Sequence, residues 1–243
     1  MAKRVGVILS GCGRLDGSDP AETLLALLII DRAGGRAVCA APDGDQRRVV
    51  DHLAEAVTGG SRDARVEATR LVGGPVLPLA ALDADAVDAL IVPGGEGALT
   101  TLSDYADKHE LCRVDADVVR ILRALLPAHR PMGFVGHAAL LAARVLGPIA
   151  GVRLTLGSKG TPAAKHAAIM GADVRPCAVD DVIVDQKARV YTTPGFLAEE
   201  ASLAGVARAM DRLVRAVVGA ARDRSPGTAP GAAPTTDRGR GFA

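Results

Sequence analysis

The chain has 243 residues, of which 49% are hydrophobic, so it is long enough to bury the core of one domain. Its formal net charge of +1 provides no long-range field that would attract nucleic acid or an anionic membrane surface. Aromatic residues make up 2% of the chain and tryptophan is absent, so platforms for stacking bases are nearly absent as well. These values favour a soluble protein that binds neither nucleic acid nor membrane.

Signals for targeting and for metal binding are weak. The apolar run near the start extends only from Val5 to Leu9, far short of the roughly 20 residues that span a bilayer. The four cysteines form no C-x-x-C pair, and none lies near a histidine at ligand spacing. We therefore expect a cytoplasmic protein with reduced thiols, no metal site and no cofactor.

Strand-like and helix-like segments alternate along the chain, beginning with the apolar run Val5–Leu9, which is typical of a buried strand. A helix is predicted over Pro20–Ala33, because Leu and Ile recur at helical spacing before Gly34-Gly35. Further strands are predicted at Arg36–Ala41, Val87–Val92, Met132–Val135, Leu154–Leu156, Val182–Val184 and Val190–Thr192. Further helices are predicted at Gln46–Val57, Arg62–Val72, Asp115–Leu126, His137–Val145 and Glu199–Ala221.

This alternation predicts an α/β fold, a flavodoxin-like three-layer sandwich with a mostly parallel sheet and helices on both faces. The domain is expected to span residues 1–221. From about Arg222 the composition shifts to Pro, Gly, Thr, Ala and Arg, which bury too little apolar surface to offset the entropy of ordering. Residues 222–243 are therefore expected to form a disordered tail.

In open α/β sheets ligands bind beyond the carboxyl ends of the strands, so the turns at those positions are informative. The first turn ends near Glu22, which can be interpreted as a proton carrier in a pocket. Glu22 also follows Asp19 by three residues, the spacing of a capping box that needs no catalytic role, and spacing alone favours this cap. A dinucleotide-binding loop is disfavoured, because Gly17 comes one residue late and Asp16 would face the pyrophosphate.

Two later turns carry further candidates. Gly94 and Gly95 follow a predicted strand, and their N–H groups could bind an oxyanion, although a tight strand-to-helix turn also explains them. The passage from Val135 through Gly136 to His137 resembles a nucleophile elbow. Gly136 stands at the elbow position, and it has no side chain that can react.

The three turns, in this order, resemble those of the ThiJ/PfpI (glutamine-amidotransferase-like) superfamily, and more narrowly its ElbB-type branch, the enhancing-lycopene-biosynthesis or isoprenoid-biosynthesis glyoxalases. The similar stretches run from residue 5 to about residue 194, and they are VGVILSGCGRLDGSDPAE, AVDALIVPGGEGA, LCRVDADV, RPMGFVGHAALL and CAVDDVIVDQKARVYTTP.

In intact members of this branch the elbow carries a cysteine that is assisted by a glutamate. The resemblance places that glutamate at Glu22, the oxyanion donors at the backbone N–H groups of Gly95 and His137, and Gly136 at the position of the cysteine. It also implies a cofactor-free reaction on a small-molecule metabolite, and a homodimer. Glycine cannot form the covalent intermediate on which the family's glyoxalase chemistry depends.

Three interpretations therefore stay open. In the first, Glu22 and His137 carry out non-covalent acid–base catalysis on a small carbonyl or acyl metabolite, although the His137 side chain could instead point away and pack. In the second, Cys12 is a displaced nucleophile. In the third, the protein is a pseudoenzyme with a ligand-binding or regulatory role, whose pocket keeps Thr193. We favour the altered enzyme, because a carboxylate beside an oxyanion turn serves little purpose in folding alone.

Overall fold

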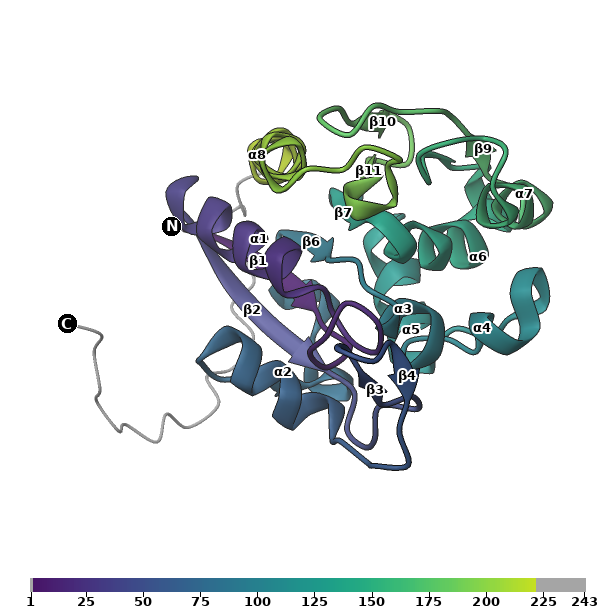
Figure 1. Ribbon diagram of the computed structural model, residues 1–243. Coiled ribbons are helices and arrows are strands. Elements are labelled where there is room, and N and C mark those ends of the chain that lie inside the picture. The colour runs from purple at the N-terminus through teal and green to yellow at the C-terminus, as the bar shows by residue number, and fades with distance from the viewer. Residues whose placement is uncertain (1, 222–243) are drawn as a thin grey trace.

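A seven-stranded sheet forms the centre of the molecule, and helices cover both of its faces (Figure 1). The computed structural model describes residues 2–221. In spatial order the strands are β10 (Ile183–Asp185), β11 (Val190–Thr193), β7 (Met132–Val135), β6 (Ala89–Val92), β1 (Lys3–Ile8), β2 (Gly35–Ala41) and β5 (Leu77–Pro78). Neighbouring strands run parallel except β10 and β11. The predicted flavodoxin-like α/β class is confirmed.

Two groups of helices pack against opposite faces of this sheet. One face is covered by α1 (Pro20–Arg32), α2 (Ala64–Val72) and α8 (Leu203–Ala220). The other is covered by α5 (Ala116–Leu125) and α6 (Ala139–Ala150). Further helices are α3 (Gly97–Thr100), α4 (Tyr105–Lys108) and α7 (Pro162–Ile169).

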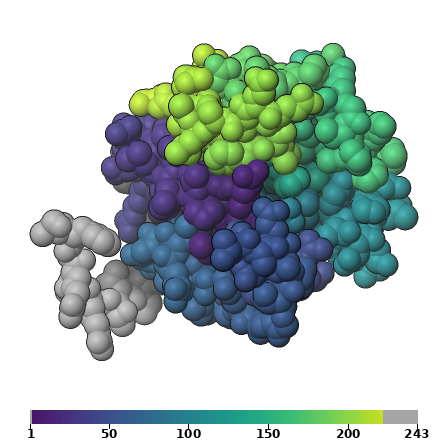
Figure 2. All heavy atoms as spheres, in the orientation of Figure 1, coloured from purple at the N-terminus to yellow at the C-terminus, as the bar shows by residue number. Residues whose placement is uncertain are grey.

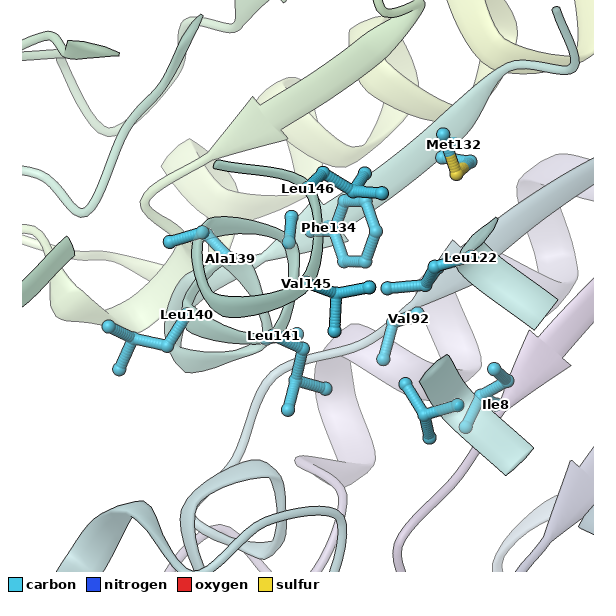
Figure 3. Packing of buried hydrophobic residues seen from close by; sticks show 14 of the residues in the cluster. Ile8, Val92, Leu122, Met132, Phe134, Ala139, Leu140, Leu141, Val145 and Leu146 are labelled. Carbon is cyan, nitrogen blue, oxygen red and sulfur yellow. The ribbon is translucent and has the colours of Figure 1, made fainter. Parts of the chain in front are cut away.

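The pleat of the strands divides the core into two layers. On β1, Val5 and Val7 pack with α1 and α8, whereas Ile8 packs with α5 and α6. Phe134 of β7 lies beside Leu146 of α6 in the second layer (Figure 3). Because both faces of the sheet are covered, the central strands β6 and β7 consist of buried apolar residues and glycine, and they are visible in the sequence as continuous apolar runs.

The predicted helix at Gln46–Val57 is wrong. This segment forms a loop and a small hairpin of β3 (Val50–Asp51) and β4 (Ala56–Val57). The physical reason is tertiary hydrogen bonding to the loop after β1. Gln46 Nε2 donates to Asp16 O at 3.1 Å, and Val50 N donates to Asp16 Oδ2 at 2.8 Å. These contacts outweigh the weak helical periodicity of the segment.

Other differences are smaller. The strand predicted at Leu154–Leu156 is β8 (Arg153–Leu154), which pairs with β9 (Asp173–Val174) outside the main sheet. Within residues 2–221, none of the helices combines the length and hydropathy needed to span a bilayer. The predicted tail at residues 222–243 lies outside the described residues, so the domain boundary stays a prediction.

Candidate functional site

A cleft of about 530 Å³ lies at the carboxyl ends of the central strands. It is surrounded by the turns that follow β1, β6, β7 and β11, together with part of the β3–β4 hairpin. In Figure 2 the purple N-terminal residues lie next to the blue residues of the hairpin segment. Four of the predicted site residues line it: Glu22, Gly95, Gly136 and His137.

The carboxyl group of Glu22 is held by two backbone N–H donors from distant parts of the chain. Gly94 N donates to Oε2 at 2.8 Å, and Phe196 N donates to Oε1 at 3.1 Å. The side chain is almost fully enclosed, since the residue is 2% exposed. A Cβ at Gly94 would lie 2.5 Å from Oε2, and one at Gly195 would collide with Oε1. Glycine at these two positions therefore leaves room for the carboxyl group.

The capping box expected at the start of α1 is only half formed. The Asp19 side chain accepts from Glu22 N at 3.0 Å, as an N-cap should. The return bond is missing, because Asp19 N donates to Gly94 O at 2.9 Å and the Glu22 carboxyl bonds elsewhere. Asp19 caps the helix without help from the Glu22 side chain, so capping does not account for the position of that carboxyl.

Burial gives the cleft a neutral acid and a neutral base. It raises the pKa of Glu22 from 4.5 to about 8, helped by the nearby Asp19 charge and opposed by the bonds from Phe196 and Gly94. Burial also lowers the pKa of His137 from 6.5 to about 4, and the positive charge of Arg14 acts in the same direction. At neutral pH Glu22 is therefore mostly protonated, and the His137 imidazole is uncharged.

Gly136 has a left-handed backbone conformation, which glycine adopts without strain and which would strain a residue with a side chain. Its φ is +53°, in the left-handed region, and it opens the 3₁₀ turn Gly136–Ala138 between β7 and α6. The nearest atoms to an added Cβ would be Pro194 O at 3.3 Å and Leu197 Cγ at 3.6 Å. There is therefore nearly enough room for a small side chain at position 136. The main cost of such a side chain would be the positive φ that its residue must adopt.

The backbone N–H groups of Gly95 and His137 are candidates for an oxyanion site. The N–H of Gly95, whose φ is +101°, makes no hydrogen bond with any described residue. The N–H of His137 belongs to the first turn of the helix, where backbone donors have no acceptor within the helix. Both residues line the cleft, so the two donors are available to a developing negative charge there.

The remaining predicted residues do not line the cleft. Gly94 acts behind it by holding Glu22. Thr193 is fully buried at the end of β11, and its hydroxyl has no hydrogen-bond partner among the described residues. Cys12 lies on the turn after β1, and burial, together with the charges of Glu67 and Asp16, raises the pKa of its thiol. A raised pKa reduces the fraction of nucleophilic thiolate.

Several residues that line the cleft were not predicted from the sequence, namely Arg14, His52, Glu96 and Phe196. The Arg14 guanidinium carbon lies 5.2 Å from the centre of the Phe196 ring. Arg14 and Phe196 follow the ends of β1 and β11, so the rule that ligands bind beyond strand ends could have marked both. No sequence signal places His52, because the hairpin that carries it was predicted to be a helix.

Comparison with known proteins identifies the class of fold and then the family. No model of a known protein family matches the sequence. A solved isoprenoid biosynthesis protein with an amidotransferase-like domain, from Ehrlichia chaffeensis, is 26% identical with a TM-score of 0.84, over 91% of this chain and 100% of that one. A ThiJ/PfpI domain protein from Brachyspira murdochii, 16% identical with a TM-score of 0.56 over 90% and 96% of the two chains, shares the fold.

Curated relatives are more similar in sequence. The human glutamine amidotransferase-like class 1 domain-containing protein 3, mitochondrial, is 37% identical over 210 residues, which are 82% of this chain and 77% of the relative. The rat ES1 protein homolog, mitochondrial, is 36% identical over 205 residues, 81% and 76% of the two chains. The chain therefore belongs to the glutamine amidotransferase-like class 1 family. It shares its fold with ThiJ/PfpI domain proteins.

These relatives also correct one expectation from the sequence. The cytoplasmic location predicted from the short apolar run is contradicted, because the human and rat relatives are mitochondrial proteins.

The raised pKa of Glu22 and the lowered pKa of His137 predict opposite pH dependences of stability. Between about pH 4.5 and 8 the folded chain holds a proton on Glu22 that the unfolded chain releases, so this carboxyl lowers the free energy of unfolding as pH rises. Between about pH 4 and 6.5 the unfolded chain protonates His137 and the folded chain does not, so this imidazole raises the free energy of unfolding as pH rises.

Urea unfolding of Glu22→Gln and His137→Gln across this range tests both signs. The stability of wild type relative to Glu22→Gln should fall with pH by up to about 1.4 kcal/mol per pH unit, and relative to His137→Gln it should rise over the lower window. Glu200→Gln, at an exposed position, is the control and should give a flat difference. Flat differences for all three variants would contradict both assigned pKa values.

Gly136→Ala is expected to lower the free energy of unfolding by about 1–2 kcal/mol, because alanine must adopt a positive φ there. Gly59→Ala is the matched control, since an added Cβ there meets no atom within 4 Å. Chemical denaturation of both variants measures the difference. An equally stable Gly136→Ala would mean that the turn relaxes and is not an elbow.

Proposed function

We propose that the chain is an ElbB-type member of its family in which Gly136 replaces the elbow cysteine. We further propose that it catalyses non-covalent acid–base chemistry on a small carbonyl or acyl metabolite. The order of the motifs and the description of the Ehrlichia chaffeensis relative support the branch. The observation that carries the chemistry is the buried Glu22 carboxyl, which lines the cleft with a pKa of about 8.

Glu22 supplies a positioned acid. Each carboxyl oxygen accepts one backbone N–H, from Gly94 or Phe196, so the group cannot rotate freely. Near neutral pH it carries a proton that it can donate to a bound substrate, and a pKa near the working pH suits a group that must give and regain a proton. Positioning and protonation state are thus both consistent with acid–base catalysis.

An enolisable carbonyl compound fits these groups. The carbonyl oxygen would lie against the N–H groups of Gly95 and His137. The neutral His137 imidazole takes a proton from the adjacent carbon, while Glu22 gives its proton to the oxygen, and an enol forms. Return of the two protons restores the catalyst. No step needs a nucleophile at Gly136.

A ligand-binding role without catalysis is the second candidate, and Gly136 favours it, because the position can form no covalent intermediate. The alternative that uses Cys12 lacks support, since this thiol does not line the cleft and its pKa is raised. A homodimer stays a prediction from the family resemblance.

Exchange of substrate hydrogen for deuterium separates catalysis from binding without knowledge of the product. Wild type in D₂O should exchange the α-hydrogens of pyruvate, hydroxyacetone or methylglyoxal, measured by NMR. Glu22→Gln should reduce the rate at least about 100-fold, because the acid is removed. Glu200→Gln, at an exposed position that does not line the cleft, should exchange at the wild-type rate. Exchange by Glu22→Gln at the wild-type rate would refute the proposal.

Glutamine at position 22 must place an amide N–H₂ group opposite one of two N–H donors, so this variant is checked for folding by circular dichroism. Glu22→Asp is the second variant, because it keeps a carboxyl and withdraws it from Gly94 and Phe196. Its exchange rate should also fall.

Gly136→Cys tests the proposed replacement directly. A thiol at the elbow would stand in the same cleft as Glu22, and it should react with iodoacetamide and give thiol-dependent consumption of methylglyoxal. Gly136→Ser is the control that lacks the thiol. A Gly136→Cys variant that folds but shows neither reaction would mean that position 136 is not a vacated nucleophile site.

A further inference from the structure

Arg14 is a cation at the cleft without a carboxylate partner. It is exposed on the turn after β1, and its guanidinium forms no ion pair with any described residue. It is also the only Arg or Lys among the described residues that line the cleft. An arginine that stays unpaired beside several acidic residues is available to a ligand.

The acidic residues around the cleft do not neutralise Arg14. Glu22 is mostly protonated near neutral pH, and the Asp19 carboxylate accepts the N–H of Glu22 at the start of α1. Glu96 Oε2 lies 3.5 Å from Arg48 Nη1, which supplies its counter-charge. Glu55 is exposed on the hairpin at the rim. The positive charge of Arg14 is therefore free to select a ligand.

The backbone and the side chain of Arg14 both contact residues that line the cleft. Its carbonyl oxygen accepts from Glu96 N at 2.8 Å, which joins the turn after β1 to the turn after β6. Its guanidinium lies over the ring of Phe196, and the N–H of Phe196 bonds to Glu22. A planar guanidinium held on an aromatic face keeps its N–H edges available for oxygen atoms.

We propose that Arg14 binds an oxoanion of the substrate, so that the cleft takes small carbonyl compounds that carry a carboxylate or a phosphate close to the carbonyl group. This inference rests on the proposed acid–base function, and it adds the substrate class and a residue that determines specificity. The fork of a guanidinium accommodates two oxygens of either anion. The anion on Arg14 and the carbonyl beside Glu22 would be two ends of one small molecule.

The effect of the Arg14 charge on nearby pKa values is consistent with a substrate that spans Arg14 and Glu22. Its positive charge lowers the pKa of Glu22, Glu96 and His137, so the guanidinium is close to each of these groups. A bound anion would offset that charge, and its arrival would favour the protonated form of Glu22. Binding of the substrate would thus help to keep the acid protonated for the reaction.

Pairs of charged and neutral probes test the inference by isothermal titration calorimetry. Pyruvate is compared with pyruvamide, and dihydroxyacetone phosphate with dihydroxyacetone. Wild type should bind at least one anion more tightly than its neutral partner, and the tighter anion identifies the head group as carboxylate or phosphate. Arg14→Gln should weaken that binding about 10-fold or more, and Arg14→Lys, which keeps the charge without the fork, should give an intermediate loss.

Arg123→Gln is the matched control, because Arg123 is exposed on α5 away from the cleft, and it should bind like wild type. Equal affinity for charged and neutral probes, or unchanged anion binding by Arg14→Gln, would overturn the inference.

A deuterium-exchange assay on the same proteins separates this inference from the proposed function. Anion binding that depends on Arg14, without exchange that depends on Glu22, would reject the acid–base chemistry and retain the anion site. Exchange that depends on Glu22, but with a rate on the charged probes that Arg14→Gln leaves unchanged, would retain the chemistry and reject the anion site.

Discussion

The burial of one carboxyl group between two backbone N–H donors organises this site. Glu22 belongs to α1, Gly94 to the turn after β6, and Phe196 to the turn after β11, so their hydrogen bonds join three segments far apart in the chain. Burying a carboxylate in its charged form is costly, and the chain meets this constraint by keeping the proton on, as the pKa of about 8 indicates. The glycines at 94 and 195 then follow from the space that the carboxyl occupies.

The same burial sets the chemistry that is available at the cleft. An acid that is protonated and an imidazole that is neutral can exchange protons with a substrate near neutral pH. Gly136 retains the φ of an elbow while offering no nucleophile. Under the proposed function, the backbone donors and the buried acid are the reactive parts of the cleft.

Arg14 is the residue of this cleft that we propose selects the ligand, by binding its anionic group. The turn that carries it is anchored to the turn after β6 through Glu96, and its guanidinium rests on Phe196. A family defined by a shared fold can therefore differ in substrate through a few residues on the turns, because turns tolerate changes that the packed strands do not. The β3–β4 hairpin contributes His52 and Glu55 to the lining of the cleft.

The sequence by itself determined the sheet and its helices, because continuous apolar runs such as Met132–Val135 and the periodic helix Pro20–Arg32 carry local signals. It also marked Glu22 and Gly136 as candidates. Only the tertiary structure decided that the Glu22 carboxyl bonds to Gly94 and Phe196 instead of completing a capping box. It also decided that Gln46–Val57 form a loop and the β3–β4 hairpin, bonded to Asp16. Both outcomes depend on partners distant in the chain, and local periodicity contains no information about such partners.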